Sequence, residues 1–157
     1  MDRTGHPEAE AWHEAGHAVV AHLLGGRVRR VSLEDEIDGL DGHAAIEWRC
    51  GSRRELAERS GRAALGGPLA ELVYRGDDDL EDLHVLAAWD ADWEEVEAAA
   101  RIVERDAARR ISLIRSWIDD VRALLDDPDV AERVARVADA LDAHGALDDE
   151  LFEDAVG

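Results

Sequence analysis

The sequence predicts a mainly α-helical domain that contains one small β-hairpin. Apolar residues recur at helical spacing over most of the chain, whereas two short apolar runs lie between residues 27 and 48, the second of which alternates with a period of two. The chain has 157 residues, of which 46% are hydrophobic, which is enough for one sizeable core. We therefore expect a single domain over residues 1–157, with an N-terminal half at about 8–90 and a helical C-terminal half at about 91–157.

The first elements are a helix and the hairpin. Apolar and small residues at helical spacing predict a helix over residues 8–24, and Gly25-Gly26 supplies its end. Two short runs at 27–33 and 43–48 predict strands, because the first holds apolar residues without Pro, the second alternates, and a segment rich in turn residues separates them.

The rest of the chain predicts helices. Pro128 follows two aspartates, which suits the first turn of a helix because proline needs no hydrogen bond there and acids favour the positive end of the dipole. No linker long enough to separate two domains is found. The expected helices cover residues 52–75, broken or kinked at Gly66-Gly67-Pro68, then 79–89, 92–125, 128–143 and a terminal stretch at 147–156.

Charge excludes several classes of partner. The chain carries 38 acidic and 18 basic residues, for a formal charge of −20 that repels phosphate backbones and anionic membranes. The single cysteine, Cys50, cannot form an internal disulfide, and no apolar run approaches the length of a membrane span. The first residues lack the pattern of a secretory signal. We expect a cytoplasmic protein that binds neither nucleic acid nor membranes.

An HExxH motif, His13-Glu14-Ala15-Gly16-His17, lies inside the first predicted helix. Residues four apart share one helix face, so both imidazoles suit a single Zn²⁺ ion, and Glu14 sits beside its open position. Zinc acidifies a bound water, and a carboxylate that is not a ligand can take the proton and pass it on. Gly16 costs about 1 kcal/mol relative to Ala in a helix interior. A close approach by another backbone or side chain would explain that glycine.

These residues resemble a known family. Residues 13–21, HEAGHAVVA, look like the zinc-binding helix of the FtsH family of ATP-dependent zinc metalloproteases. Residues 67–72, GPLAEL, followed by Gly76, are similar to the family's GxxAEEL helix, which ends in Gly. Residues 78–83, DDLEDL, resemble the acidic helix start that supplies the family's third zinc ligand. The resemblance covers about 8–89.

The resemblance implies zinc on His13 and His17, catalysis by Glu14, and an aspartate after the glycine as third ligand. Two Asp-Leu pairs compete for that role, and each is followed by apolar residues at helical spacing. Asp79 lies in the first turn of its predicted helix, whereas Asp82 leaves a separation nearer to that of the family, so we favour Asp82 slightly. The other carboxylate would then serve at the helix start.

Two further residues are weaker candidates. Glu71 follows small and apolar residues on a helix expected to pack near the site, where it would accept a hydrogen bond from a zinc-bound histidine. A solvated helix charge is the alternative for Glu71. His84 is a less favoured nitrogen ligand.

The sequence departs from the family in having no Walker motif and no transmembrane helices. We therefore expect a zinc metalloendopeptidase that hydrolyses unfolded or flexible polypeptides without ATP. An edge strand of the hairpin would pair with the substrate backbone. A separate unfoldase, an adaptor or a second copy of the chain are the partners that this leaves open.

Three other interpretations stay open. In the first, the chain keeps the fold and the zinc but acts only as an interaction protein. In the second, it is an acidic helical binding protein that mimics an anionic surface. A different HExxH family, whose members cleave phage-type repressors, is the third, although HEAGH and the GxxAE segment argue against it.

Overall fold

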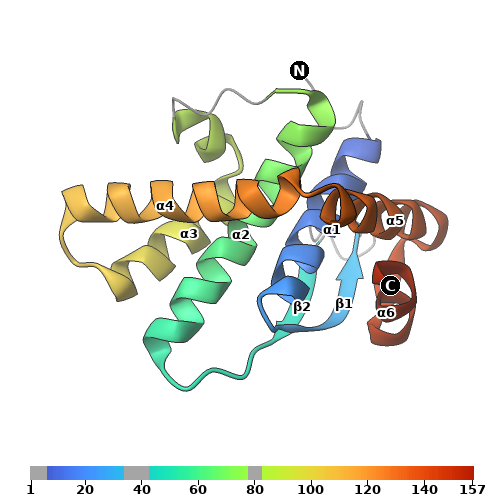
Figure 1. The fold of residues 1–157 in the computed structure, drawn as a ribbon, viewed down its shortest axis with the longest axis horizontal. Coiled ribbons are helices and arrows are strands. Elements are labelled where there is room, and N and C mark those ends of the chain that lie inside the picture. The colour runs from blue at the N-terminus through green and yellow to red at the C-terminus, as the bar shows by residue number, and fades with distance from the viewer. Residues whose placement is uncertain (1–6, 34–42, 78–82) are drawn as a thin grey trace.

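The computed structural model describes residues 7–33, 43–77 and 83–157. They form a mainly helical protein with a small three-stranded antiparallel sheet, which confirms the predicted fold class (Figure 1). The order of elements is α1 (Pro7–Leu23), β1 (Arg27–Ser32), β2 (His43–Glu47), α2 (Arg53–Arg75), the 3₁₀ helix η2 (Leu83–Ala88), α3 (Asp90–Val103), α4 (Ala107–Asp126), α5 (Pro128–His144), β3 (Ala146–Asp148) and α6 (Asp149–Val156).

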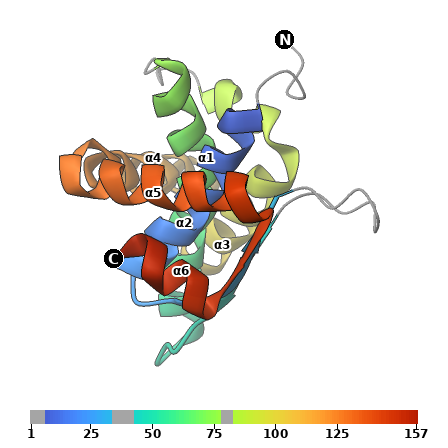
Figure 2. The same cartoon turned by 90° about the vertical axis from the view of Figure 1, so that its right-hand side faces the viewer.

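Helix α1 is the central element of the fold. It packs against α2 on one side and against α5 on another, and α4 packs on α2. In Figure 1, α4 and α5 follow one another across α1 and α2, and Figure 2 shows the same layer from the side with α6 below it. None of the described helices is both long and apolar enough to cross a membrane.

The sheet has the order β2-β1-β3, so β1 is the middle strand and β2 lies at an edge. Both pairings of β1 are antiparallel, and Val31 is in register with Ala44 of β2 and Leu147 of β3. The register between β1 and β2 shifts between Val28 and Arg30.

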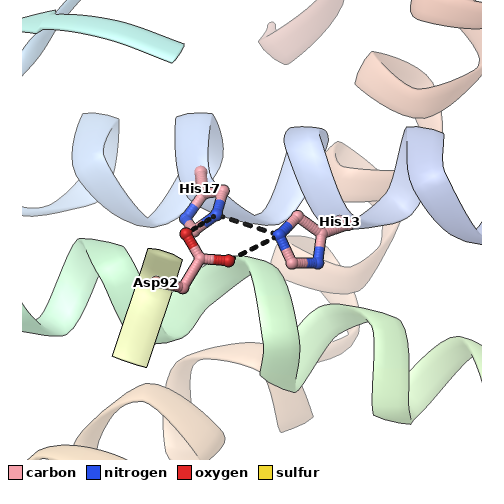
Figure 3. A group of neighbouring side chains, drawn as sticks. All are labelled: His13, His17 and Asp92. Atoms are coloured by element: carbon pink, nitrogen blue, oxygen red, sulfur yellow. Dashed lines mark hydrogen bonds and ion pairs between the residues drawn. The ribbon is translucent and has the colours of Figure 1, made fainter. Parts of the chain in front are cut away.

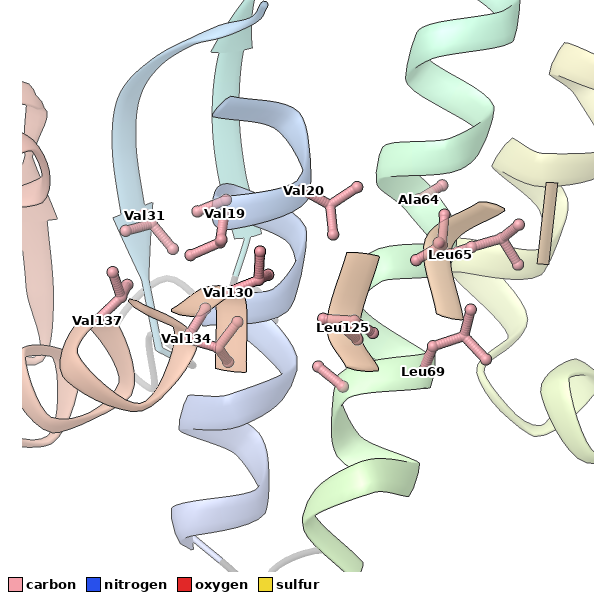
Figure 4. Close-up of a cluster of buried hydrophobic side chains, with 14 of the residues drawn as sticks. Val19, Val20, Val31, Ala64, Leu65, Leu69, Leu125, Val130, Val134 and Val137 are labelled. Atoms are coloured by element: carbon pink, nitrogen blue, oxygen red, sulfur yellow. The ribbon is translucent and has the colours of Figure 1, made fainter. Parts of the chain in front are cut away.

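Buried branched side chains fill the space between the helices and the sheet (Figure 4). A fully buried side chain of this size contributes about 1.5–3 kcal/mol relative to an exposed one. Trp117 of α4 has no exposed surface and lies over Gly61 of α2, where an added Cβ would be 2.4 Å from its ring. The buried hydrophobic residues labelled in Figure 4 are Val19, Val20, Val31, Ala64, Leu65, Leu69, Leu125, Val130, Val134 and Val137.

The predicted ends of two helices were wrong. A single helix over residues 92–125 was expected, but α3 ends at Val103 and α4 begins at Ala107, because Glu104 is extended and the Asp106 carboxylate caps the new helix by accepting from the Arg109 N–H. The terminal stretch was expected to be helical from residue 147, but Ala146–Asp148 pairs with β1 before α6 begins.

Helix α2 runs without interruption through the Gly66-Gly67-Pro68 segment, where a break or kink was expected. Proline there removes one helical hydrogen bond, but the segment is buried and lies against α1. The helix ends at Gly76, which has a φ of 73° and whose backbone N–H caps the last turn. The helix expected over residues 79–89 is a 3₁₀ helix in its described part, Leu83–Ala88.

Candidate metal centre

The HExxH motif lies in the middle of α1, so its two histidines are one helical turn apart. The imidazole rings of His13 and His17 lie edge to face, with centroids 4.8 Å apart. Their Nε2 atoms are separated by 3.2 Å (Figure 3). Both rings therefore present the same nitrogen to one point in space.

Asp92, in the first turn of α3, faces that point. One carboxylate oxygen lies 2.8 Å from the His13 Nε2 atom, and the other lies 3.1 Å from the His17 Nε2 atom. The three side chains offer ligand atoms that all lie within 4.8 Å of one another, so they form a possible metal-binding triad.

The far nitrogen of each imidazole contacts an acceptor. His17 Nδ1–H donates to the backbone carbonyl of Ala63 over 2.8 Å, and His13 Nδ1 lies 3.3 Å from a Glu71 carboxylate oxygen. A carbonyl oxygen can only accept, so the proton of a neutral His17 is on Nδ1 and its Nε2 carries a lone pair. The contact of His13 with Glu71 does not meet the geometry of a hydrogen bond, but the carboxylate charge beside it favours a proton on His13 Nδ1 as well.

Glu71 is 1% exposed, and its charge is balanced on both sides. Its second oxygen accepts from Arg75, one turn along α2, over 2.9 Å. A buried carboxylate is costly unless it is paired, and here the cation of Arg75 and the ring of His13 provide the partners. Arg75, Glu71 and His13 thus form a continuous polar chain.

The donor set fits a zinc ion. Ligand atoms at about 2.0–2.1 Å from a tetrahedral zinc ion lie about 3.3–3.4 Å from one another. The two Nε2 atoms are 3.2 Å apart, close to that separation, and the carboxylate of Asp92 reaches both, with one oxygen 2.8 Å from His13 and the other oxygen 3.1 Å from His17. Two nitrogen lone pairs and a carboxylate that converge in this way repel one another unless a cation, either a proton or a metal, lies between them.

The ionisation of the triad reflects the same convergence. Burial lowers the pKa of His17, but the Asp92 carboxylate outweighs it and raises the pKa from 6.5 to about 9. The pKa of His13 is also raised, because its contacts with Asp92 and Glu71 outweigh the effect of burial. Burial raises the pKa of Asp92, but the two imidazoles hold it well below its usual value. A metal ion at this position would therefore compete with a proton.

Glu14 lies beside the triad at a cavity of about 260 Å³. Glu14 is 8% exposed, so its carboxylate is largely shielded from water. The cavity lies between α1, α2, α3 and the segment that starts at β2. Its lining consists of Glu14, His17, Ala44, Ile46, Trp48, Ser60, Ala63, Ala64, Asp92 and Glu95.

Glycines allow α1 and α2 to approach closely at this centre. A Cβ on Gly16 would lie 2.3 Å from the carbonyl oxygen of Gly66, which confirms the close approach expected at that position. A Cβ on Gly67 would lie 2.3 Å from the His17 Nε2 atom. Gly67 thus makes room for the imidazole that would hold the metal.

The structure brings His13, Glu14 and His17 together and places Glu71 behind His13. The two aspartates predicted as third ligand, Asp79 and Asp82, lie outside the described residues, as does the side chain of His84.

Sequence analysis missed Asp92 as a ligand candidate. A signal for it existed, because Asp92 stands in a first helical turn and is followed by Val96, Ala99 and Ala100, which are buried at helical spacing. The same pattern had been applied only to the two earlier aspartates.

No protein-family model matches the chain, and no curated protein matches it either. The likeness to the peptidase domain of the FtsH family therefore depends on the motifs in the sequence.

Proposed function

We propose that the chain is a zinc metallopeptidase of the FtsH peptidase type, with zinc on His13, His17 and Asp92 and with Glu14 as general base. The observation that carries the proposal is the convergence of two imidazole nitrogens and a carboxylate beside a cavity that Glu14 also lines. Asp92 takes the role for which the sequence offered Asp79 or Asp82.

When bound, Zn²⁺ polarises a carbonyl and lowers the pKa of a water molecule to about 7. Glu14 would accept a proton from the attacking water while the water oxygen bonds to the peptide carbonyl carbon. Glu14 would then deliver this proton to the amide nitrogen as the carbon–nitrogen bond breaks. Its low exposure keeps this carboxylate away from bulk solvent.

The residues behind the ligands support this chemistry by fixing the rings. The carbonyl of Ala63 and the carboxylate of Glu71 hold the Nδ1 atoms, which keeps each Nε2 available as a ligand. The lowered pKa of Asp92 keeps its carboxylate anionic, which is the form that binds a metal ion.

The sheet favours an extended substrate. Strand β2 is at an edge of the sheet, and Ala44 and Ile46 of this strand line the cavity. An extended peptide that pairs with a strand edge exposes alternate side chains to such a cavity. We infer unfolded or flexible polypeptides as substrates. We also propose a cytoplasmic location for the chain and a separate unfoldase or adaptor as its partner.

The test compares three variants with the wild type. Metal analysis of protein purified without chelator should give one zinc per chain, and His17→Ala should lose it. Glu14→Gln should keep the zinc but no longer cleave an unfolded casein. Glu94→Gln, an equal charge change at an exposed residue outside the cavity, should leave cleavage unchanged.

Each outcome separates the interpretations. Zinc without turnover on any unstructured polypeptide would favour an inactive zinc-binding interaction protein. Protein that takes up no zinc would exclude both zinc-based functions and leave the acidic binding protein.

A further inference from the structure

The cavity beside the metal centre has two kinds of lining. Apolar side chains come from the β2 segment and from α2, whereas carboxylates come from α1 and α3. None of the described residues that line it is an arginine. The apolar members are Ala44, Ile46, Trp48, Ala63 and Ala64, and the acidic members are Glu14, Asp92 and Glu95.

Glu95 is the carboxylate that the proposed mechanism does not use. It lies three residues after Asp92 on α3 and borders the same cavity. Within the described part of the chain it makes neither a hydrogen bond nor an ion pair. The arginines on either side of Ser60 do not reach it, since Arg59 pairs with Glu55 and Arg62 pairs with Asp120.

The charges of the loaded site leave Glu95 unbalanced. A zinc ion carries two positive charges, which the carboxylates of Asp92 and Glu14 neutralise. Glu95 is an exposed residue, so its charge then remains in contact with solvent on one side and beside the apolar cavity walls on the other, and its partial burial raises the pKa of the carboxyl group. A cation that entered the cavity would supply the missing partner.

Resting on the proposed function, we propose that Glu95 selects substrates that carry Lys or Arg close to the scissile bond. The aliphatic stem of the basic residue packs on Ile46 and Trp48, and its charged head pairs with the Glu95 carboxylate. The formal charge of −20 adds a long-range attraction for basic segments.

Peptide binding tests this selectivity without turnover. Zinc-loaded protein that keeps Glu14 is mixed in a stopped-flow instrument, so that binding is recorded before turnover, with blocked alanine-rich hexapeptides that carry one Arg, or the neutral isostere citrulline, at each position in turn. The tryptophan fluorescence of the protein, to which Trp48 in the cavity lining contributes, reports binding. At the best position the Arg peptide should bind about fivefold more tightly than the citrulline peptide, as expected for a partly exposed ion pair of about 1 kcal/mol.

Two further variants locate the effect. Adding Glu95→Gln should bring the two affinities within about a factor of two while one zinc stays bound, because Glu95 is not a ligand. Adding Glu94→Gln, the same charge change on the same helix but outside the cavity lining, should keep the difference. Equal loss in both variants would indicate general electrostatic attraction and would overturn the role of Glu95.

The remaining outcomes distinguish this inference from the proposed function. Equal binding of Arg and citrulline peptides, or no binding up to millimolar concentration, would overturn the selectivity even if the wild type cleaves casein. Binding that depends on Glu95 in a protein whose wild type cleaves nothing would support the selectivity and reject the peptidase.

Discussion

The two faces of α1 are built in contrasting ways. Toward α2 the contact is made by glycines, with the Gly16 and Gly66 backbones too close for a Cβ on either. Toward α5 and the sheet, Val19 packs among branched side chains that include Val134 (Figure 4). The glycine face positions the candidate ligands and brings the two backbones together beside Val20, whereas the valine face packs branched side chains against one another. Site geometry and stability therefore depend on different residues of one helix.

Metal removal should have the largest effect on the glycine face. Bound zinc stabilises the folded chain by about 4 kcal/mol when free zinc exceeds its dissociation constant a thousandfold. Without zinc, a proton on His17 can take its place, and the occupancy of that proton depends on pH. Burial lowers the pKa of His17, but the Asp92 carboxylate outweighs burial and raises this pKa from 6.5 to about 9. A raised pKa stabilises the fold fully below pH 6.5, and this contribution is lost as the pH rises through about 9.

Chelation should therefore lower the Tm more at pH 9.5 than at pH 6.5. Differential scanning calorimetry of zinc-loaded and EDTA-treated protein at the two pH values measures this difference. An equal drop at both would contradict the role assigned to His17 and Asp92.

Gly67→Ala should be the most damaging substitution for the centre itself. The new Cβ would lie 2.3 Å from the His17 Nε2 atom and would displace the ring, so zinc affinity should fall by about 100-fold. The fold should survive, because alanine favours a helix by about 1 kcal/mol over glycine. Competition with a chromophoric chelator gives the affinity. Gly51→Ala is the control, since its Cβ would meet only Glu55 at 3.4 Å.

Val134→Ala should lower the stability of the fold and leave the metal centre intact. Its side chain has no exposed surface, so truncation should cost about 2 kcal/mol in the free energy of unfolding by urea. Zinc content and affinity should stay at the wild-type level, because the valine face contributes no ligand. Loss of zinc from the folded variant would show that the two faces of α1 are coupled.

Glu71→Gln should give the smallest change. The amide keeps the shape of the side chain but loses the charge that faces His13 and Arg75, so zinc affinity should fall by about tenfold. The same titration measures it. Glu58→Gln removes an exposed ion pair with Arg54 on the same helix and should leave the affinity unchanged.

The parts of the site that could be predicted are those encoded within one helix. The spacing of His13 and His17 follows from helical geometry, and the helical window around them was strong enough to place both on one face. Asp92 lies 79 residues beyond His13, and only the packing of α3 against α2 brings it close. The carbonyl of Ala63 has no side-chain signature at all.

The fold shows the same limit. The long amphipathic helices α1 and α5 were predicted to within about one residue at each end, because each has several turns of periodic pattern. Strand β3 has three residues, too few for an alternation to be visible, and its pairing with β1 depends on chain segments far apart in sequence. The division between α3 and α4 was marked by Asp106, an N-cap residue whose signal was overlooked.

The sandwiched position of α1 also has a consequence for biosynthesis. A nascent chain that has been synthesised past α3 already contains His13, His17, Asp92 and the groups behind them. Val19 acquires its cover only later, when residues 128–144 have left the ribosome. Translation would thus separate any metal binding from closure of the core, and a zinc ion held early would fix α1 against α2 and α3 before α5 and α6 are synthesised.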